Sequence, residues 1–480
     1  MSELGPRRRT LVLAICCASM VLVVVDISIV NTALPRIRDD LAVTVTGLQW
    51  IVDAYTLVLA AFLLLAGSTA DRVGRRRVFQ TGLLVFGVGS LSCGVSPGIG
   101  WLVAARAVQA IGATMLNPVA MAIVADTFTV PAERARAIGV FGSMSGLSLA
   151  LGPVLGGVLI DSFGWRSVFW VNVPLALVAF ALTTRYVPES RAPRPRRFDP
   201  VGQLLVVVVL GSVVYAVIES NRQGWTAPVI VGLLVVAALA TAGLVGYEAR
   251  RADPLLQWRL FRSVPFSSAI LMALFGLAAF AAFLFVTTLY LQHVRGMSAL
   301  TAGLSLLPVG ALIALLSPYT GTVVGARGVR LPLLASGTAL TLGGLTSLLI
   351  GPATPLVAVL ASYLLFGIFQ GTLNPPVTNT AIAGMPRSMA GLATSLASAG
   401  RQTGTTLGVA VAGTMVGSVG DGTSFTDSTR PVWWLVSGLG VGIAALGLLS
   451  TGRWARGTAA RAATRFADAA GTASATGGRG

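Results

Sequence analysis

This 480-residue sequence has little charge, a single histidine, three cysteines and no lysine. Charged residues make up 11% of it, against about 25% in soluble proteins, which argues against a water-soluble fold. Without lysine there is no Gly-x-x-x-x-Gly-Lys phosphate loop, so ATP-driven pumping would need a separate subunit. With one histidine and no clustered acids, we expect no enzyme site. The cysteines (Cys16, Cys17 and Cys93) lie in apolar stretches, so we expect neither disulfides nor a thiolate metal site.

The sequence has long apolar runs instead, and its mean hydropathy is +0.82. A spanning helix needs about 20 mostly apolar residues, and irregular backbone is not tolerated against hydrocarbon. We therefore predict an all-α polytopic membrane protein with fourteen transmembrane helices. The predicted spans are 11–30, 48–68, 78–96, 101–126, 136–160, 167–187, 201–220, 227–247, 266–292, 301–324, 331–350, 354–382, 392–418 and 432–451.

Two arginine-rich gaps divide these spans into groups of six, two and six. The predicted parts are an N-terminus at 1–10, a six-helix bundle at 11–187, a linker at 188–200, two additional helices at 201–247, a linker at 248–265, a second six-helix bundle at 266–451 and a disordered tail at 452–480. A repeat supports the division, since glycine- and arginine-rich turns, Gly67–Arg77 and Gly321–Arg330, follow the second helix of each bundle. Such repeats are typical of transporters whose substrate site lies between the halves.

The arginines indicate the orientation. Most of them lie in the gaps on the side of the N-terminus, and the opposite gaps hold only Arg36, Arg38, Arg166, Arg222, Arg295 and Arg430. By the positive-inside rule both termini, the two linkers and the tail are cytoplasmic. Topology thus explains the net charge of +17, and no folded basic domain suggests a nucleic-acid partner. Arginine without lysine, together with abundant alanine and glycine, is typical of a GC-rich bacterial genome.

The turn after the second span carries a recognisable pattern. It reads Gly67-Ser-Thr-Ala-Asp71-Arg-Val-Gly74-Arg75-Arg-Arg, and resembles the Gly-x-Leu-Ala-Asp-Arg-x-Gly-Arg-Arg signature of the major facilitator superfamily. Glycines permit a tight turn, and a carboxylate and arginines can latch helix ends together. The resemblance implies that Asp71 and Arg75, with Asp126, stabilise one state of an alternating-access cycle. The alternative is ordinary topology-setting charge.

Further motifs narrow the resemblance to the 14-helix drug:proton antiporters of that superfamily, including multidrug efflux proteins that expel quaternary ammonium compounds. The matching stretches are Val25–Pro35, Trp50–Tyr55, Gly164–Pro174, Tyr290–Gln292 through Ala302–Leu304, and Asn374–Pro376 through Arg401–Gly404. They cover nearly the whole membrane domain. The resemblance implies secondary active export driven by a proton gradient, with no cofactor.

Four charges inside the predicted spans stand out: Asp26, Asp53, Arg106 and Arg401. Each costs about 2.5–3.5 kcal/mol at a helix centre, so we expect them to face a cavity or one another. Removal of a carboxylate from water favours its neutral form, which makes Asp26 and Asp53 candidate proton carriers. Arg106 shares a helix face with Gln109, and the resemblance implies that it assists proton transfer. The alternative is a permanent ion pair between an aspartate and Arg106 or Arg401.

Two further groups of residues are candidate functional positions. Gly152, Pro153, Gly156 and Gly157 resemble the Gly-Pro-x-x-Gly-Gly signature that marks antiporters. Proline removes a backbone hydrogen bond and small residues let a neighbouring helix approach, so plain helix packing is an equally good explanation. Asn374, Arg401 and Gln402 are the polar candidates of the second bundle, with a structural pairing as the alternative.

Together these features predict a secondary transporter in the cytoplasmic membrane of a bacterium. We expect it to export amphiphilic or cationic drugs or antibiotics in exchange for protons, as a monomer whose other partners are the lipid bilayer and the substrate. The alternative is a carrier of the same fold for one endogenous substrate, either an exporter of a self-made metabolite or an uptake system. A membrane enzyme or a receptor fits least well, since the sequence offers neither catalytic residues nor a long soluble loop.

Overall fold

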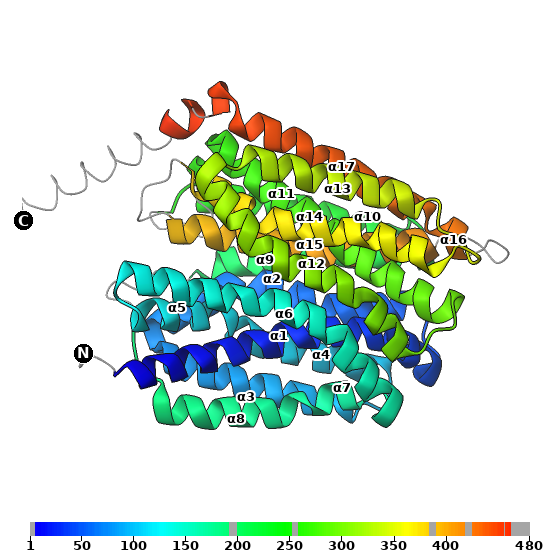
Figure 1. Ribbon diagram of the computed structural model, residues 1–480, viewed down its shortest axis with the longest axis horizontal. Coiled ribbons are helices and arrows are strands. Elements are labelled where there is room, and N and C mark those ends of the chain that lie inside the picture. Colours follow the sequence, from blue (N-terminus) through cyan, green and yellow to red (C-terminus); the bar gives the residue numbers. More distant parts are fainter. Residues whose placement is uncertain are drawn as a thin grey trace, which may run out of the picture.

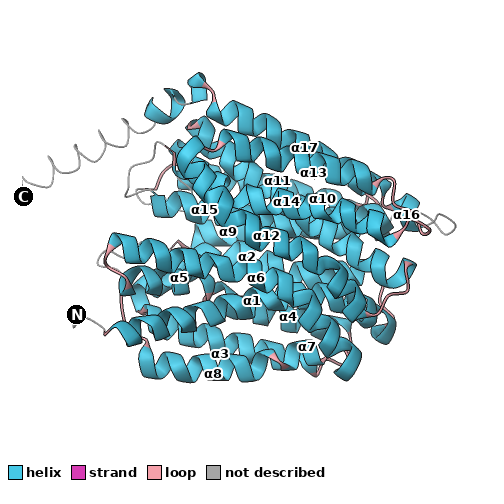
Figure 2. Ribbon diagram, viewed as in Figure 1, coloured by secondary structure: helices cyan, strands magenta, loops and turns pink. Residues whose placement is uncertain are grey.

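The computed structural model describes residues 5–191, 199–251, 258–383, 390–417, 425–455 and 457–461. The described chain is mostly helical, with loops and turns between the helices, and contains no strand (Figure 2). Its long helices run roughly parallel and antiparallel, so most side chains face either a neighbouring helix or the outside of the bundle (Figure 1). The predicted all-α class is confirmed. Most of the predicted linker 188–200, residues 252–257 of the predicted linker 248–265 and most of the predicted tail lie outside these residues.

The first half of the chain forms eight helices. They are α1 (Pro6–Leu41), α2 (Val45–Val73), α3 (Arg75–Gly94), α4 (Ile99–Thr114), α5 (Asn117–Thr127), α6 (Pro131–Phe163), α7 (Ser167–Trp170) and α8 (Asn172–Tyr186). The predicted spans 101–126 and 167–187 are each divided in two. In the first case Pro118 explains the break, because proline fits the first turn of a new helix but not the interior of a continuous one.

A hairpin and a second group of helices follow. The hairpin is α9 (Pro200–Gln223) and α10 (Pro228–Glu248). The second group is η1 (Trp258–Arg262), α11 (Val264–Leu289), η2 (Tyr290–Val294), α12 (Ala299–Arg327), α13 (Arg330–Ser347), α14 (Leu356–Ile382), α15 (Ala390–Gly417), α16 (Phe425–Ser428) and α17 (Arg430–Thr451). In Figure 1 the first eight helices lie together on one side of the molecule and α11 to α17 on the other.

Ten helical segments of the described chain are long and apolar enough to cross a membrane. Helices α3, α6, α13 and α15 coincide with the remaining predicted spans, although they are not among the ten. The structure therefore agrees with a polytopic membrane protein, while the count of fourteen stays a prediction.

The two ends of the bundle differ in how the halves meet. We call the end where α1 begins and α17 finishes the near end, and the opposite end the far end (Figure 1). Gln49 of α2 donates a hydrogen bond to the carbonyl of Ala410 in α15 over 2.6 Å, and Gln292 donates to the carbonyl of Thr32 over 2.9 Å. The Leu300 amide donates to Asp161 over 3.1 Å. These three hydrogen bonds between the halves lie toward the far end.

Candidate functional site

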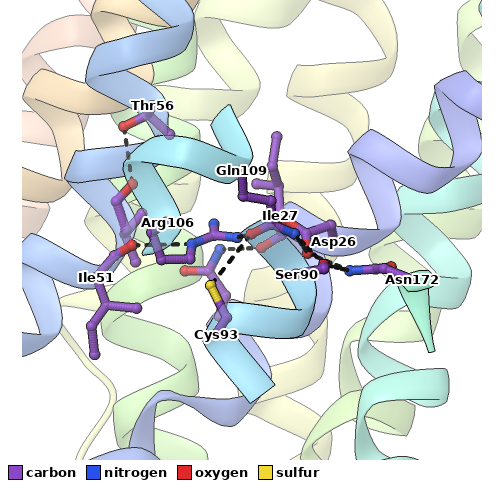
Figure 3. Close-up of polar contacts among 11 residues, drawn as sticks. Asp26, Ile27, Ile51, Thr56, Ser90, Cys93, Arg106, Gln109 and Asn172 are labelled. Atoms are coloured by element: carbon purple, nitrogen blue, oxygen red, sulfur yellow. Dashed lines mark hydrogen bonds and ion pairs between the residues drawn. The ribbon is translucent and has the colours of Figure 1, made fainter. Parts of the chain in front are cut away.

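Asp26 is the centre of a buried polar network in the first half of the molecule (Figure 3). Its side chain is fully buried in α1, and its Oδ2 pairs with Nη1 of Arg106 from α4 at 2.7 Å. Its Oδ1 accepts hydrogen bonds from Gln109 over 2.8 Å and from Asn172 over 2.7 Å. Both amides also donate to the hydroxyl of Ser90, at 2.7 and 3.0 Å. The carboxylate is therefore held by three donors from two further helices.

Arg106 is equally enclosed, with 1% of its surface exposed. Its Nη1 also donates to Oε1 of Gln109 over 2.6 Å, which places the two side chains on one face of α4, as predicted. Its Nε donates to the carbonyl of Ile51 over 3.4 Å, and its guanidinium lies 4.1 Å from the centre of the Tyr55 ring. The charge of Arg106 is thus balanced by Asp26 and by an aromatic face, as a buried ion requires.

Asp53 occupies a different environment on α2. It is fully buried, its Oδ1 accepts a long 3.4 Å hydrogen bond from Thr56, and its Oδ2 has no hydrogen-bond partner within the described structure. Gln49 lies one turn earlier on the same helix face and bonds to α15, whereas Tyr55, which contacts Arg106, is on another face. Asp53 is therefore directed toward the other half of the molecule, and the structure does not join it to the Asp26 network.

The near end holds the predicted latch. Arg75, at the start of α3, pairs with Asp71 of α2 at 3.0 Å and with Asp126 of α5. The Arg75 side chain is 12% exposed, so water screens these contacts only partly. One guanidinium therefore ties the ends of three helices together.

The turn of the latch is shorter than predicted. Helix α2 continues to Val73, and the chain turns at Gly74 alone, where φ is +126°. Gly67 therefore lies inside α2, with open space where a Cβ would stand, so the expectation of a turn there is wrong. Gly74 is favoured for two reasons: its φ disfavours other residues, and a Cβ would come within 2.5 Å of the Glu189 carboxylate, which would have to move. Glu189 in turn accepts a hydrogen bond from the Arg76 amide over 3.2 Å.

Helix α6, which carries the residues that resemble the antiporter motif, lies in the first half where it meets the second. A Cβ on Gly152 would be 2.5 Å from the Ser28 side chain of α1, and one on Gly156 would be 3.3 Å from Ile29. Gly157 faces the other half, since its Cβ would be 2.6 Å from the amide of Leu300 in α12. The carbonyl of Pro153 lies directly against Gly303 of α12. The glycines thus let α6 approach α1 on one side and α12 on the other.

The polar candidates of the second half are not gathered into a comparable network. Asn374 on α14 and Arg401 and Gln402 on α15 are partly buried. Arg401 donates a 2.6 Å hydrogen bond to Ser398, one turn away on its own helix. No acid in the described part of the chain pairs with it, so the predicted alternative of an Asp26–Arg401 or Asp53–Arg401 pair is wrong. Within the same residues, no three histidine, cysteine or acidic side chains cluster as a metal ion would need.

Sequence reasoning found most of the charged members of these sites and missed Glu189 and several neutral ones. Ser90 has no signal of its own, because small hydroxyl residues are common in membrane helices. Asn172 lies within a matching motif but was not singled out. Tyr55 lies at the end of the Trp50–Tyr55 motif, and its contact with Arg106 was not predicted. Glu189 follows the sixth predicted span, where a lone acid among arginines was a usable signal.

Comparison with known proteins places the chain in a family. Residues 16–409 match the model of the Major Facilitator Superfamily. The chain is 38% identical over 410 residues to the multidrug resistance protein Stp of Mycobacterium tuberculosis, covering 85% of this chain and 76% of the relative. It is 34% identical over 409 residues to the methylenomycin A resistance protein of Streptomyces coelicolor, covering 84% of each. It is also 36% identical over 414 residues to a puromycin resistance protein of Streptomyces alboniger, covering 85% and 82%.

The fold is shared with a solved transporter. The crystal structure of a peptide transporter POT in complex with sulfate superimposes with a TM-score of 0.67 over 93% of this chain and 94% of that one, at 15% identity. The chain belongs to the Major Facilitator Superfamily and is a multi-pass membrane transporter, not an enzyme.

Proposed function

We propose that this chain exports amphiphilic or cationic drugs or antibiotics from the cytoplasm in exchange for protons, by alternating access. The resistance proteins among its relatives support the drug substrate. The observation that carries the proton coupling is the contrast between two buried carboxyl groups. Asp26 is held by Arg106, Gln109 and Asn172, whereas one oxygen of Asp53 has no donor.

Asp53 is the group that holds a proton in this conformation. An ionised carboxylate without a cation costs several kcal/mol inside a membrane, and a protonated carboxyl group removes that charge. The proton also turns the unpaired oxygen into a hydrogen-bond donor. Because Asp53 faces the other half of the molecule, a cationic amphiphile between the halves competes with the proton for this carboxylate. Mutually exclusive binding is sufficient for exchange.

After proton binding, the Asp26–Arg106 ion pair acts as the switch between conformations. Protonation of Asp26 leaves Arg106 without its counterion in a fully buried site, which is strongly unfavourable. Relief requires the helices that carry the network to shift relative to one another. A change in charge at one atom is thereby converted into a movement of α1 against α4 and α8.

The movement opens one end of the bundle and closes the other. Hydrogen bonds join the halves toward the far end, while the latch of Asp71, Arg75 and Asp126 belongs to the near end. The arginine distribution makes the near end cytoplasmic. We assign the close contacts of Gly152, Gly156 and Gly157 to the hinge between the halves. Asn374, Arg401 and Gln402 then line the substrate path. A single chain contains every part of this mechanism, so the transporter acts as a monomer.

The proposal is tested with inverted membrane vesicles energised by respiration, in which a pH-sensitive dye reports proton release when a quaternary ammonium dye or an antibiotic is added. Proton release by the normal chain and its loss in both Asp53→Asn and Asp26→Asn, at equal abundance, is the expected result. Asp39→Asn is the matched control, because Asp39 is exposed near the end of α1. Normal proton release by a well-expressed Asp53→Asn variant refutes its role as carrier. A response to only one compound class would favour the carrier with a single endogenous substrate.

A further inference from the structure

Arg401 carries a charge that has no counterion within the described structure. It lies eleven residues after Ala390 in the 28-residue helix α15, which is about 16 Å along the axis at 1.5 Å per residue. Arg401 is therefore close to the middle of the span. A charge at that depth is costly, and the charges that membrane proteins keep there usually mark a substrate or ion pathway.

The packed faces of α15 show where Arg401 does not point. A Cβ on Gly404 would collide with the carbonyl of Leu274, so that face packs against α11. Another face carries the carbonyl of Ala410, which accepts the hydrogen bond from Gln49 of α2. At 100° per residue, Arg401 lies about 60° from Gly404 and opposite Ala410. It is therefore on a third face of the helix.

That third face continues into the core between the halves. Ala412 and Val416 follow Arg401 within about 60° around the helix axis. Both belong to a hydrophobic core that also contains Val30 of α1 and Phe283 of α11, one from each half of the molecule. Arg401 therefore faces the space between the halves and not the lipid.

The space beside Arg401 opens toward the near end. Ser398, Arg401 and Thr405 lie on the third face and are partly exposed. Ala412 and Val416 lie on the same face nearer the far end and are buried. The hydrogen bonds between the halves lie toward the far end as well. In this conformation the guanidinium is thus reached from the near end.

The guanidinium of Arg401 is oriented and still has donors to offer. Its Nη2 donates to the hydroxyl of Ser398 over 2.6 Å, and no acid in the described residues pairs with it. Arginine has five N–H donors in a planar fork that fits a carboxylate. The other buried charges are not available, because Asp53 is fully enclosed and Arg106 is paired with Asp26. A molecule that enters from the near end therefore meets a positive charge.

We propose that Arg401 binds the acidic group of an amphiphilic substrate, a carboxylate or another oxyanion. This inference rests on the proposed function and narrows its substrate class to drugs that carry such a group on an apolar body. The oxyanion accepts hydrogen bonds from the free N–H groups of Arg401, while Ser398 holds the guanidinium in place. An amine elsewhere on the same molecule remains for Asp53.

Two other roles for Arg401 fit the structure less well. An arginine that only holds helices together is expected to pair with an acid or with groups on a neighbouring helix, yet its hydrogen bond goes to a hydroxyl of its own helix. A substrate that is only a cation would meet a like charge at this point of the path, and like charges disfavour one another.

The test measures binding of three probes with the same pyrene body to the purified full-length chain at pH 7. They are pyrenebutyrate, its neutral methyl ester and pyrenebutyl trimethylammonium, and energy transfer from the tryptophans of the chain to pyrene reports binding. The normal chain is expected to bind the carboxylate at least about tenfold more tightly than the ester. Arg401→Gln should remove that preference and leave the affinity for the ester unchanged, and Arg401→Lys should keep part of it.

Arg327→Gln is the matched control, because it removes the same charge from an exposed position at the end of α12. Three results would overturn the proposal. They are equal binding of carboxylate and ester by the normal chain, an equal loss of both in Arg401→Gln, and tightest binding of the trimethylammonium probe regardless of Arg401. The second result would make Arg401 structural, and the third would make the substrate a cation. Because binding is measured without proton release, failure here leaves the proton-exchange proposal standing.

Discussion

The two halves of this molecule use buried polar residues in opposite ways. In the first half, Asp26 and Arg106 form an ion pair whose remaining hydrogen-bonding groups are mostly satisfied by amides, a hydroxyl and a carbonyl. In the second half, Arg401 has one hydrogen bond to its own helix and no acid within the described structure.

The second half contains a cluster of aromatic rings instead. The rings of Phe283 and Phe366 stack at 4.0 Å, and Tyr363 and Trp433 meet them edge-on. The difference agrees with the proposal that the first half carries the charge-dependent switch, while these rings give the described spans of the second half an apolar interior.

The largest expected effect comes from breaking the ion pair of the first half. Arg106→Leu leaves Asp26 buried with neutral donors only, which costs about 3–5 kcal/mol. Arg401→Leu leaves no acid unpaired, so its effect on stability should be close to zero or favourable. Thermal unfolding of the two purified variants measures the difference directly.

The double variant Asp26→Asn with Arg106→Leu is the control for the first comparison. It removes both charges and should recover most of the lost stability without recovering proton-coupled transport. An Arg401→Leu variant as unstable as Arg106→Leu would show that Arg401 has a structural role, and the contrast between the halves would be lost.

The sequence was sufficient for the fold class and for the four charges buried within the spans, for a physical reason. Long apolar runs permit only helices in lipid, and a charge in such a run is rare enough to attract attention. This reasoning identified Asp26, Asp53, Arg106 and Arg401. It did not distinguish the partnered from the unpartnered charges, because pairing depends on how distant helices are rotated.

The neutral partners and the helix ends were harder to predict. Ser90 and Asn172 reach Asp26 from α3 and α8, far along the chain, and nothing local marks them. Gly67 was assigned to a turn because glycine usually ends helices, yet α2 passes through it as membrane helices often do. Among the glycines that the structure describes, only Gly74 combines a positive φ with a crowded Cβ position, and that combination exists only in the folded chain.

The second largest effect is expected at the contact between α6 and α12, where the halves meet. Gly303→Val in α12 forces a side chain against the Pro153 carbonyl of α6, which should cost about 1–3 kcal/mol and loosen the far end. Gly321→Val is the matched control on the same helix, because nothing lies within 4 Å of its Cβ position. Unfolding and drug export are measured for both. If the two variants behave alike, the close approach of α6 and α12 does not hold the halves together.

The smallest effect concerns the two corresponding turns of the halves. Gly74 and Gly328 both have positive φ, at +126° and +80°, so alanine strains the backbone in each case by about 1–3 kcal/mol. Only Gly74 also faces a side chain, because its Cβ position is 2.5 Å from Glu189, whereas that of Gly328 is open. Gly74→Ala should therefore be the more destabilising by about 1 kcal/mol, as measured by thermal unfolding.

A double-mutant cycle isolates the cause of that difference. The Gly74→Ala effect should shrink to that of Gly328→Ala when Glu189→Ala is also present, because the crowded carboxylate is then gone. An unchanged effect in the Glu189→Ala background would place the whole cost in the backbone. The two turns would then be equivalent in energy, and they would differ only in the latch of Asp71, Arg75 and Asp126 that the first turn carries.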